Sequence, residues 1–297
     1  MQNKSPFLSI VTPTYNRGSL LSRCYESLSS QTNTDFEWII VDDGSTDDTA
    51  AVVSTFSQDK FPITYVKKEN GGKHTALNTS HGYIQGSFVL ILDSDDYLTN
   101  DAVQLVKNSW APYVNDSEVG VVTLLRGKTT KHPLCIAPTP DLPVDLLRYK
   151  RKKIFSSDCC EVIRTELFLK YPFPIFQEER FLSEGALWCR VALTHKCVYI
   201  NKVIYLCEYL EGGLTKSGRS MRIRNPLGGM YSSELCMHPK NFFLQRVKKS
   251  LLYCCYGFFA DKSFMQILKE TKYPFLVGCC LIPGFIMYKL WKKKYTY

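Results

Sequence analysis

Three carboxylates follow a short apolar run in the first third of the chain. Residues Val89–Leu92 have the composition of a strand buried in a parallel sheet, and Asp93, Asp95 and Asp96 follow it directly. Carboxylates this close repel one another and lose solvation when buried, so the cluster needs a positive partner. A hard divalent cation such as Mg²⁺ or Mn²⁺ prefers oxygen ligands and can bridge to a phosphate. The alternative is an Asp-rich turn that caps a helix beginning near Thr99.

The elements that must position these carboxylates alternate between strand and helix. Strands are expected at Phe7–Thr12, Phe36–Val41, Ile63–Val66, Val89–Leu92 and Val119–Leu124, with helices between them at 19–30, near 50–56, through 76–78 and at 99–110. This alternation predicts βαβ units and a mainly parallel sheet, hence an α/β fold. Ser45 or Thr46 is expected to cap the second helix. Ligands of open α/β sheets bind beyond the carboxyl ends of strands, where Asp42 and Asp43 would join the Asp93 cluster.

Two common nucleotide-binding motifs are missing from the sequence. The first strand–helix turn has no Gly-x-Gly-x-x-Gly, which counts against a dinucleotide-binding site. The chain has no Gly-x-x-x-x-Gly-Lys-Ser/Thr loop, which counts against a nucleoside triphosphatase. A nucleotidyltransferase stays an alternative, although the Gly-rich first loop with Arg or Lys expected of that class is absent.

Four motifs in order resemble family 2 glycosyltransferases of the GT-A fold. The motifs are Val11–Arg17, Val41–Asp47, Asn70–Lys73 with Asn78, and Leu92–Asp96. The resemblance covers roughly the first 210 residues. It implies transfer of a sugar from a nucleotide-diphosphate donor, expected to be a UDP-sugar, with inversion at the anomeric carbon. The expected acceptor is a hydroxyl of a glycan or lipid-linked glycan, as in bacterial surface-polysaccharide assembly.

The resemblance also assigns residues to the donor. It implies that Thr12, Pro13 and Tyr15 line the base and ribose, and that Asp42 or Asp43 accepts a hydrogen bond from the base. It places Lys73 near the nucleotide, Asp93 and Ser94 by the ribose, and Asp95 on a divalent Mn²⁺ or Mg²⁺ cofactor. Such a cation would offset charge on the departing diphosphate. For Lys73 the alternative is a solvated loop lysine.

A further acidic residue is the candidate general base. The stretch Phe181–Arg190 resembles the family's acidic motif near the acceptor, often written Glu-Asp, whose carboxylate takes the acceptor's proton. The second position here is Gly185, so the role falls to Glu184, with Glu178 and Glu179 as fallback candidates. Alternatively Glu184 only favours the start of a helix that Ser183 caps. The departure at Gly185 keeps open a catalytically inactive sugar-nucleotide-binding or scaffold protein, which the intact Asp93 and Asp95 argue against.

Charge and cysteine usage separate the end of the chain from the rest. The formal net charge is +9, and from Lys240 onward eleven Lys and Arg face two acids, so the first 239 residues balance. We therefore expect a catalytic domain at 1–239 and a basic, apolar helical extension at 240–297. The twelve cysteines include three adjacent pairs and no Cys-x-x-Cys, which indicates reduced, core-filling thiols.

The extension is expected to make peripheral contact with a membrane. Its longest apolar stretch, 274–288, contains Pro283 and Gly284 and is shorter than the roughly 20 residues that span a bilayer. An interfacial anchor on an anionic leaflet fits its lysines, and a helical subdomain packed on the core is the alternative. The N-terminus shows no signal peptide, so the cytoplasmic side of the cell membrane is the expected location. No nucleic-acid-binding motif accompanies the basic residues.

Two loops are expected on the acceptor and donor sides. Residues 126–153 are rich in proline and end in a basic run, which indicates a lid or an acceptor-side insertion. Residues 216–224 contain four Lys or Arg, and a mobile basic loop that closes over the diphosphate is one interpretation. A solvated basic loop is the other.

Overall fold

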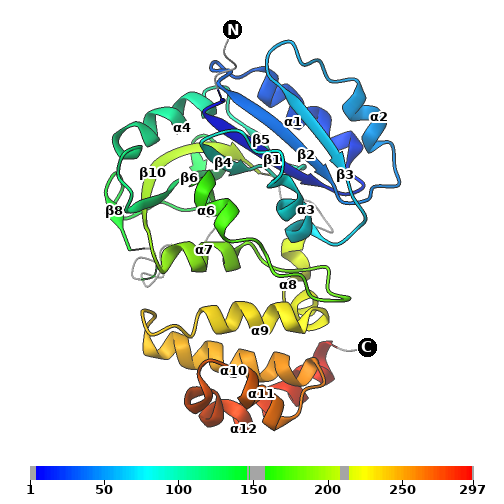
Figure 1. Cartoon of the computed structure of the whole chain (residues 1–297), viewed down its shortest axis with the longest axis vertical. Helices are drawn as coiled ribbons and strands as arrows, with labels where there is room; N and C mark the ends of the chain where they lie inside the picture. Colours follow the sequence, from blue (N-terminus) through cyan, green and yellow to red (C-terminus); the bar gives the residue numbers. More distant parts are fainter. Residues whose placement is uncertain (1–4, 146, 148–157, 208–213, 296–297) are drawn as a thin grey trace. The chain divides into compact units, whose positions relative to one another are not determined.

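The predicted alternation of strands and helices forms the larger of two compact units. The structure is a computed structural model that describes residues 5–145, 147, 158–207 and 214–295 (Figure 1). Unit 1 comprises Met1–Pro172 and Thr194–Tyr209, and unit 2 comprises Phe173–Leu193 and Leu210–Tyr297. The chain therefore passes between the two units three times.

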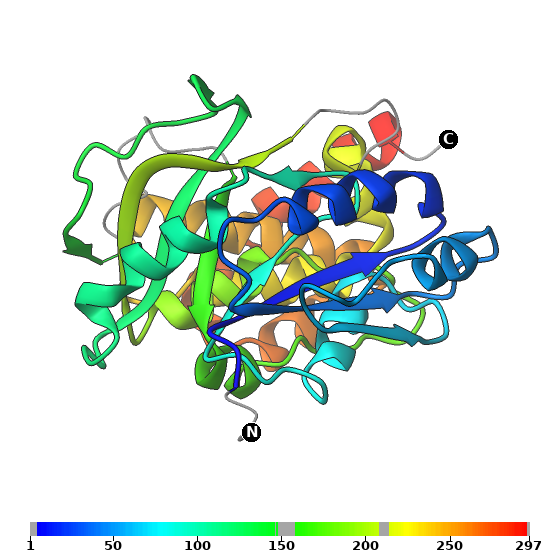
Figure 2. The ribbon, with the colours of Figure 1, turned by 90° about the horizontal axis from the view of Figure 1, so that it is seen from above.

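Unit 1 is built on one mixed sheet whose first four strands are parallel. In the order β3 (Ile63–Lys67), β2 (Phe36–Asp42), β1 (Leu8–Thr14) and β4 (Phe88–Ile91), these strands form the N-terminal half (Figures 1 and 2). Antiparallel β9 (Cys159–Arg164) joins β4 to β6 (Val119–Thr129), and β10 (Lys196–Leu206) runs parallel to β6. Short β5 (Tyr97–Leu98) and β8 (Pro143–Val144) pair with β10, and β7 (His132–Pro133) pairs with β6. The α/β prediction is confirmed.

Alternating side chains of these strands fill the core of unit 1. Because successive residues of a strand point to opposite faces, Ile10, Trp38 and Leu90 share one face of the sheet. They form a buried cluster with Leu21 of α1 (Gly18–Ser29) and Val106 of α4 (Ala102–Trp110), which a 3₁₀ turn (Ala111–Tyr113) follows. The remaining helices of unit 1 are α2 (Thr49–Ser54), α3 (Lys73–Ser80) and α6 (Thr165–Lys170).

Unit 2 is helical, as predicted for the end of the chain. Its elements are α7 (Gly185–Ala192), α8 (Leu214–Arg224), α9 (Pro226–Leu235), α10 (Phe243–Phe259), α11 (Phe264–Glu270) and α12 (Pro274–Tyr295). Met237, Tyr253, Cys254, Ile267 and Val277 are among its buried core residues. A capping box, in which Ser263 and Gln266 exchange hydrogen bonds with each other's backbone N–H, begins α11.

The division between the units differs from the predicted boundary at residues 239 and 240. That boundary lies inside unit 2, between α9 and α10, and these two helices pack against each other. Helix α9 also contacts α7, which comes from the earlier segment of unit 2. The surplus of positive charge begins at residue 240, whereas the residues that form unit 2 include earlier ones, 173–193 and 210–239.

Several local predictions were wrong. Residues 216–224 belong to helix α8, with a kink at Gly218, rather than to a loop. The N-cap of α2 is Asp48, because Ser45 instead accepts a hydrogen bond from the backbone N–H of Asn16. The lid or acceptor-side insertion at 126–153 stays a prediction; the segment contains the end of β6 and both β7 and β8, while residues 146 and 148–153 lie outside the described residues.

Helix α12 runs without interruption through Pro283. Gly284 lets α12 approach α10 closely, since a Cβ built there would lie 2.4 Å from Cβ of Cys254. Within the described part of the chain, α12 is the one helix whose length and composition suffice to cross a membrane. The helix, with 22 residues, is therefore longer than the apolar stretch 274–288 that the sequence indicated.

The cysteines fit the prediction of core-filling thiols. All twelve lie among the described residues, where none forms a disulfide and ten are buried. Two pairs approach each other, with Sγ–Sγ distances of 3.6 Å for Cys135 and Cys159 and 3.5 Å for Cys189 and Cys236.

Candidate active site

The two acidic turns lie at one edge of the sheet, as predicted. Strands β1, β2 and β4 are parallel, with Thr14 opposite Asp42 and Val11 opposite Ile91. Asp42 and Asp43 therefore end β2, and Asp93 follows β4, at the carboxyl ends of neighbouring strands.

Cationic side chains from three elements contact the Asp93 cluster. Lys73, at the start of α3, forms an ion pair with Oδ1 of Asp93. Arg17, which precedes α1, has its Nη1 2.5 Å from Oδ2 of Asp95. Arg126 of β6 has its Nη1 3.4 Å from Oδ2 of Asp93. Both carboxylates are about one-fifth exposed, so they remain accessible to a ligand that approaches this edge.

Beneath these ion pairs lies a buried polar network. The guanidinium of Arg126 lies 4.0 Å from the centre of the Tyr205 ring, and its Nε donates to the carbonyl oxygen of Cys159 at 2.8 Å. The Tyr205 hydroxyl accepts from the backbone N–H of Asp93 at 2.9 Å. Asp96 lies 3.7 Å from Nη1 of Arg126. The network thus fixes the chain directly after β4.

The two carboxylates beside Arg126 have opposite pKa shifts. Burial alone would raise the pKa of Asp93, but Lys73 and Arg126 outweigh it and hold that pKa well below its usual range. Burial and the charge of Asp93 raise the pKa of Asp96 to about 7. Asp93 is therefore ionised at neutral pH, while Asp96 is balanced between its two protonation states.

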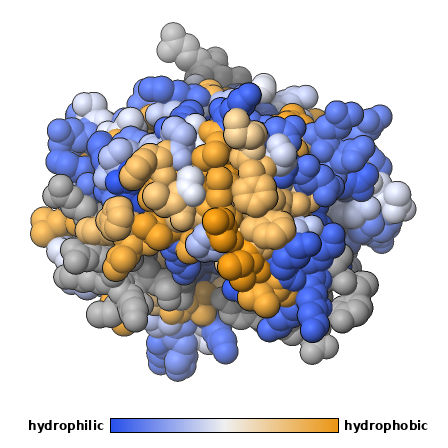
Figure 3. Space-filling view, turned by 90° about the horizontal axis from the view of Figure 1, so that it is seen from below, coloured by the Kyte–Doolittle hydropathy of each residue, from blue (hydrophilic) through white to orange (hydrophobic). Residues whose placement is uncertain are grey.

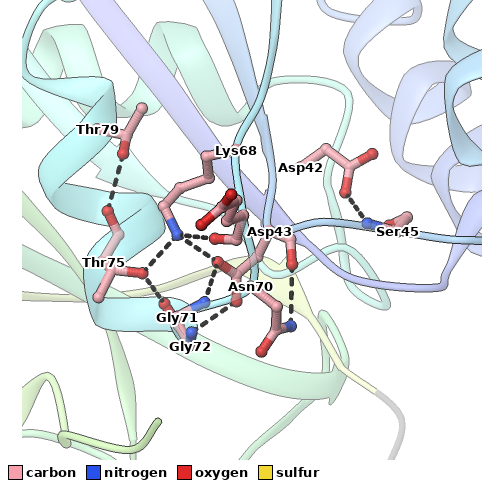
Figure 4. Close-up of polar contacts among 10 residues, drawn as sticks. Asp42, Asp43, Ser45, Lys68, Asn70, Gly71, Gly72, Thr75 and Thr79 are labelled. Atoms are coloured by element: carbon pink, nitrogen blue, oxygen red, sulfur yellow. Dashed lines mark hydrogen bonds and ion pairs between the residues drawn. The ribbon is translucent and has the colours of Figure 1, made fainter. Parts of the chain in front are cut away.

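Asp43 organises the loop that carries Lys73 (Figure 4). Its carboxylate accepts hydrogen bonds from the backbone N–H groups of Gly71 at 3.0 Å and Gly72 at 2.7 Å, and from Lys68 Nζ at 2.7 Å. Gly72 has φ +91°, a conformation that favours glycine, and α3 begins at the next residue. The Asn-Gly-Gly-Lys motif is therefore a turn built on Asp43 that aims Lys73 at Asp93.

Asp42 is held in a similar way. Its Oδ1 accepts from the backbone N–H of Ser45 at 2.7 Å and its Oδ2 from the Tyr65 hydroxyl at 2.5 Å. Both acidic residues of this turn are buried. Their side chains are engaged by the protein itself, a structural role that the sequence did not indicate.

The remaining residues assigned to the donor differ in exposure. Tyr15 is exposed, whereas Pro13 and Ser94 are buried. Thr12 is fully buried, and its hydroxyl accepts from Trp38 Nε1 at 2.9 Å. The expectation that the Thr12 side chain lines the base is corrected accordingly, because that side chain belongs to the core.

The oxygen ligands at this edge fit a hard divalent cation. The described residues contain no group of three His, Cys, Asp or Glu side chains that could enclose a metal. The chain thus offers one or two carboxylates, the number Mg²⁺ takes from a protein when phosphates and water complete its coordination. Asp95, partly exposed and paired with Arg17, is the carboxylate that fits this role.

The predicted general base lies in unit 2. Glu184 is the N-cap residue of α7, and its carbonyl oxygen accepts from the backbone N–H of Leu187 at 2.9 Å. Ser183 accepts from the Gly185 N–H at 3.3 Å with its side chain and from the Ala186 N–H at 3.0 Å with its carbonyl oxygen, as expected of a capping serine. The helix predicted here is confirmed, with its first residue at Gly185.

The fallback candidates have different surroundings. Glu179 is buried and accepts from the N–H groups of Leu227 at 2.6 Å and Gly228 at 2.8 Å, at the start of α9. Burial raises the pKa of Glu179. Glu178 is exposed and has φ +67°. Of the three glutamates, Glu179 therefore has a clear structural role.

Sequence reasoning missed Arg126, Tyr205 and the contact of Arg17. Arg17 stands inside a motif that was recognised, but its partner is 78 positions away. The available signal for Arg126 was a charged residue that follows the apolar run Val119–Leu125 in a buried strand.

The fold is of the GT-A type, and comparisons with known proteins agree. Residues 9–171 match the family described as Glycosyl transferase family 2. The chain belongs to this family.

Curated relatives are found in Streptococcus pneumoniae serotype 4. Glycosyltransferase GlyG is 34% identical over 226 residues, which cover 72% of this chain and 74% of GlyG. Glycosyltransferase GlyA is 33% identical over 222 residues, covering 70% of this chain. The chain spans 31% of the length of GlyA, so it corresponds to only a part of that protein.

The fold also matches a solved structure. S. aureus TarS residues 1–349, solved in complex with UDP, superposes with a TM-score of 0.65 at 18% identity. The match covers 97% of this chain and 90% of that chain. The resemblance extends the shared fold beyond the residues of the family match.

Proposed function

We propose that this glycosyltransferase moves a sugar from a nucleoside-diphosphate donor, a UDP-sugar, to a hydroxyl of a glycan or lipid-linked acceptor. The observation that carries the proposal is the pairing of Asp93 and Asp95 with Lys73 and Arg17 at the carboxyl end of β4. Carboxylates suit a divalent metal and the neighbouring cations suit a diphosphate. The similarity to TarS, whose structure contains UDP, supports the choice of nucleotide.

Each side chain then has a role in donor binding. Asp95 holds the divalent ion, Mn²⁺ or Mg²⁺, and Asp93 binds the ribose. Lys73 and Arg17 leave their carboxylate partners to face the diphosphate, and the exposed ring of Tyr15 contacts the base. When bound, the metal offsets negative charge that develops on the departing diphosphate.

Asp43 is the proposed acceptor of the base N–H, and Asp42 supports it. The Asp43 carboxylate is held by two backbone N–H groups and by Lys68, so its position is fixed before a donor arrives. Asp42 is bound on both oxygens by Ser45 and Tyr65. This arrangement would give the base a preorganised partner.

The second part of the proposal is inversion with Glu184 as general base. An inverting transfer needs one base to take the proton of the acceptor hydroxyl as it attacks. Glu179 already accepts two backbone hydrogen bonds, and Glu178 is exposed at a turn. Glu184, partly buried at the start of α7, is the glutamate of the three best suited to this role.

The third part concerns the acceptor and the location. We place the enzyme at the inner face of the cell membrane, with peripheral contact through 240–297, and its acceptor on a lipid carrier. The surplus of nine positive charges in this segment supports contact with an anionic leaflet.

Donor class and metal can be tested together by thermal unfolding. Purified protein is heated with UDP, GDP, CMP or dTDP, each with Mn²⁺ or with EDTA. A ligand at a hundredfold excess over its Kd stabilises the folded state by about 2.7 kcal/mol. We expect stabilisation by UDP that requires Mn²⁺, is lost in Asp95→Asn and persists in the surface control Asp59→Asn. Equal stabilisation of both variants would contradict the role of Asp95.

The base is tested by single-turnover transfer at saturating donor. General-base catalysis contributes about 10²- to 10⁴-fold, so Glu184→Gln should slow transfer by that factor and leave the UDP shift unchanged. Glu178→Gln is the matched control. If Glu178→Gln slows transfer and Glu184→Gln does not, the role belongs to Glu178.

A further inference from the structure

Helix α12 buries one of its sides within unit 2. Val277, Cys280, Leu281 and Gly284 are buried and recur every three or four residues, the spacing of one helix face. This face packs against α10, where Gly284 permits close contact with Cys254. The helix is therefore an integral part of the unit 2 core.

The opposite side of α12 is equally apolar but faces outward. Phe275, Cys279, Ile282, Ile286 and Leu290 are exposed and also recur every three or four residues. The exposed fractions of Phe275 and Ile282 are 87% and 70%. Only 28% of the most apolar 18-residue window of the helix is buried in the protein. A helix that is apolar all round is typical of a core or a membrane, and one side of α12 has no core around it.

Helix α11 extends this exposed surface. The ring centre of Phe264 lies 5.6 Å from that of Phe285 on α12, and Phe264 and its neighbour Met265 are exposed. Figure 3 shows apolar side chains gathered in a band with hydrophilic ones on its flanks. The apolar face is defined here as Phe264, Met265, Phe275, Ile282, Ile286 and Leu290. Contiguous apolar surface of this kind marks an interaction site.

The positive charge beside the apolar face indicates which kind of partner it binds. Lys289, Lys292, Lys293 and Lys294 occupy the last turns of α12, and segment 240–297 has eleven basic and two acidic residues. A surface that combines large apolar side chains with lysines matches a bilayer of anionic lipids, which offers acyl chains and phosphate head groups together.

We propose that the apolar face of α11 and α12 inserts into one leaflet of an anionic membrane while the lysines bind its head groups. The protein is expected to enter one leaflet only, as a monotopic protein. The inner side of α12 stays packed against α10, so lipid cannot surround the helix. The inference rests on the third part of the proposed function, a membrane contact through 240–297, and names the residues that make this contact.

Vesicle flotation of the full chain tests the surface directly. We expect binding to phosphatidylcholine vesicles that contain phosphatidylglycerol, and binding at least about tenfold weaker in Phe275→Ser/Ile282→Ser/Ile286→Ser. The control is Ile136→Ser/Leu142→Ser, which removes two comparably exposed apolar side chains from unit 1. Its binding should equal that of the wild type.

A second variant isolates the electrostatic part. Each lysine near an anionic surface contributes about fivefold in affinity, so Lys289→Gln/Lys293→Gln/Lys294→Gln should lose about a hundredfold on anionic vesicles. Its weak binding to pure phosphatidylcholine should not change. The UDP-dependent thermal shift should persist in every variant, so that failure of donor binding and failure of membrane binding are read separately.

Three results would overturn the proposal. The first is equal vesicle binding by the wild type and the triple serine variant. The second is a lipid-independent dimer that the serine variant abolishes, which would make the apolar face a contact between two copies. The third is membrane-bound protein that resists extraction by alkaline carbonate, which would replace the monotopic seating with a spanning helix.

Discussion

Replacing Arg126 should expose how the carboxylate cluster is kept stable. With an effective dielectric constant of about 20, the guanidinium attracts Asp93 at 3.4 Å by about 5 kcal/mol and Asp96 at 3.7 Å by about 4.5 kcal/mol. Desolvation offsets much of this, and breaking a buried pair by removing one partner costs about 3–5 kcal/mol. Arg126→Met should therefore destabilise unit 1 by about that amount. Lys73 still pairs with Asp93 in this variant, so Asp96 is the carboxylate that loses its cation.

The pH dependence of this cost identifies the responsible carboxylate. Burial and the charge of Asp93 raise the pKa of Asp96 to about 7, above its value of 3.8 in an unfolded chain. Between these values the folded protein binds a proton that the unfolded chain does not, so Asp96 lowers stability as the pH rises through this window. The cost of Arg126→Met should be larger at pH 8 than at pH 5.5, and adding Asp96→Asn should recover most of it at pH 8.

The assay is urea unfolding of four proteins, wild type, both single variants and the double variant, in EDTA at the two pH values. Arg164→Met is the matched control, because Arg164 donates to the carbonyl oxygens of Val119 and Tyr113. Adding Asp96→Asn should recover none of the cost of Arg164→Met at pH 8. Equal costs of Arg126→Met at pH 5.5 and 8, together with no recovery by Asp96→Asn, would refute the assignment of the effect to Asp96.

Three further predictions concern packing, capping and histidine burial. Gly284→Ala should destabilise the protein by about 1–3 kcal/mol in urea unfolding, because its Cβ would meet that of Cys254 at 2.4 Å, whereas Gly278→Ala, whose Cβ meets only Leu268 at 3.7 Å, should not. Glu179→Gln should cost about 1 kcal/mol by the same measurement, since the charge of the side chain that caps α9 is lost; an unchanged midpoint would show that the amide caps equally well. Burial lowers the pKa of His81, whose Nε2 is buried with no hydrogen-bond partner among the described residues. The unfolded chain therefore takes up a proton first, so stability should fall as the pH drops below about 6.5, and His81→Phe should reduce the loss of Tm between pH 7.5 and 5.5.

Strand positions and the acidic edge could be predicted because their causes are local. The runs around Ile10, Trp38 and Leu90 are mainly apolar and buried along their whole length, as expected of strands covered on both faces of a parallel sheet. Parallel pairing then brings the residues that follow these strands together without any further information.

The side chains that balance the carboxylates could not be predicted in the same way. Arg126 and Tyr205 reach Asp93 from strands that lie 33 and 112 residues further along the chain. Thr12 has the composition of a binding residue, but whether it faces a ligand or Trp38 depends on the pleat of a strand buried on both faces. Pro283 disfavours a helix locally, yet α12 continues through it where Gly284 packs against Cys254.

The order of strands in unit 1 also has a consequence for biosynthesis. Strand β10 lies between β6 and β5 in the sheet, but it leaves the ribosome only after residues 173–193, which belong to unit 2. Residues 173–193 in turn complete their packing only with the helices that follow residue 210, which are synthesised later. Neither unit can be completed before synthesis of the other has begun, so a nascent chain should expose the unpaired edge of β6 for an extended time. Chaperone dependence during translation is the expected result.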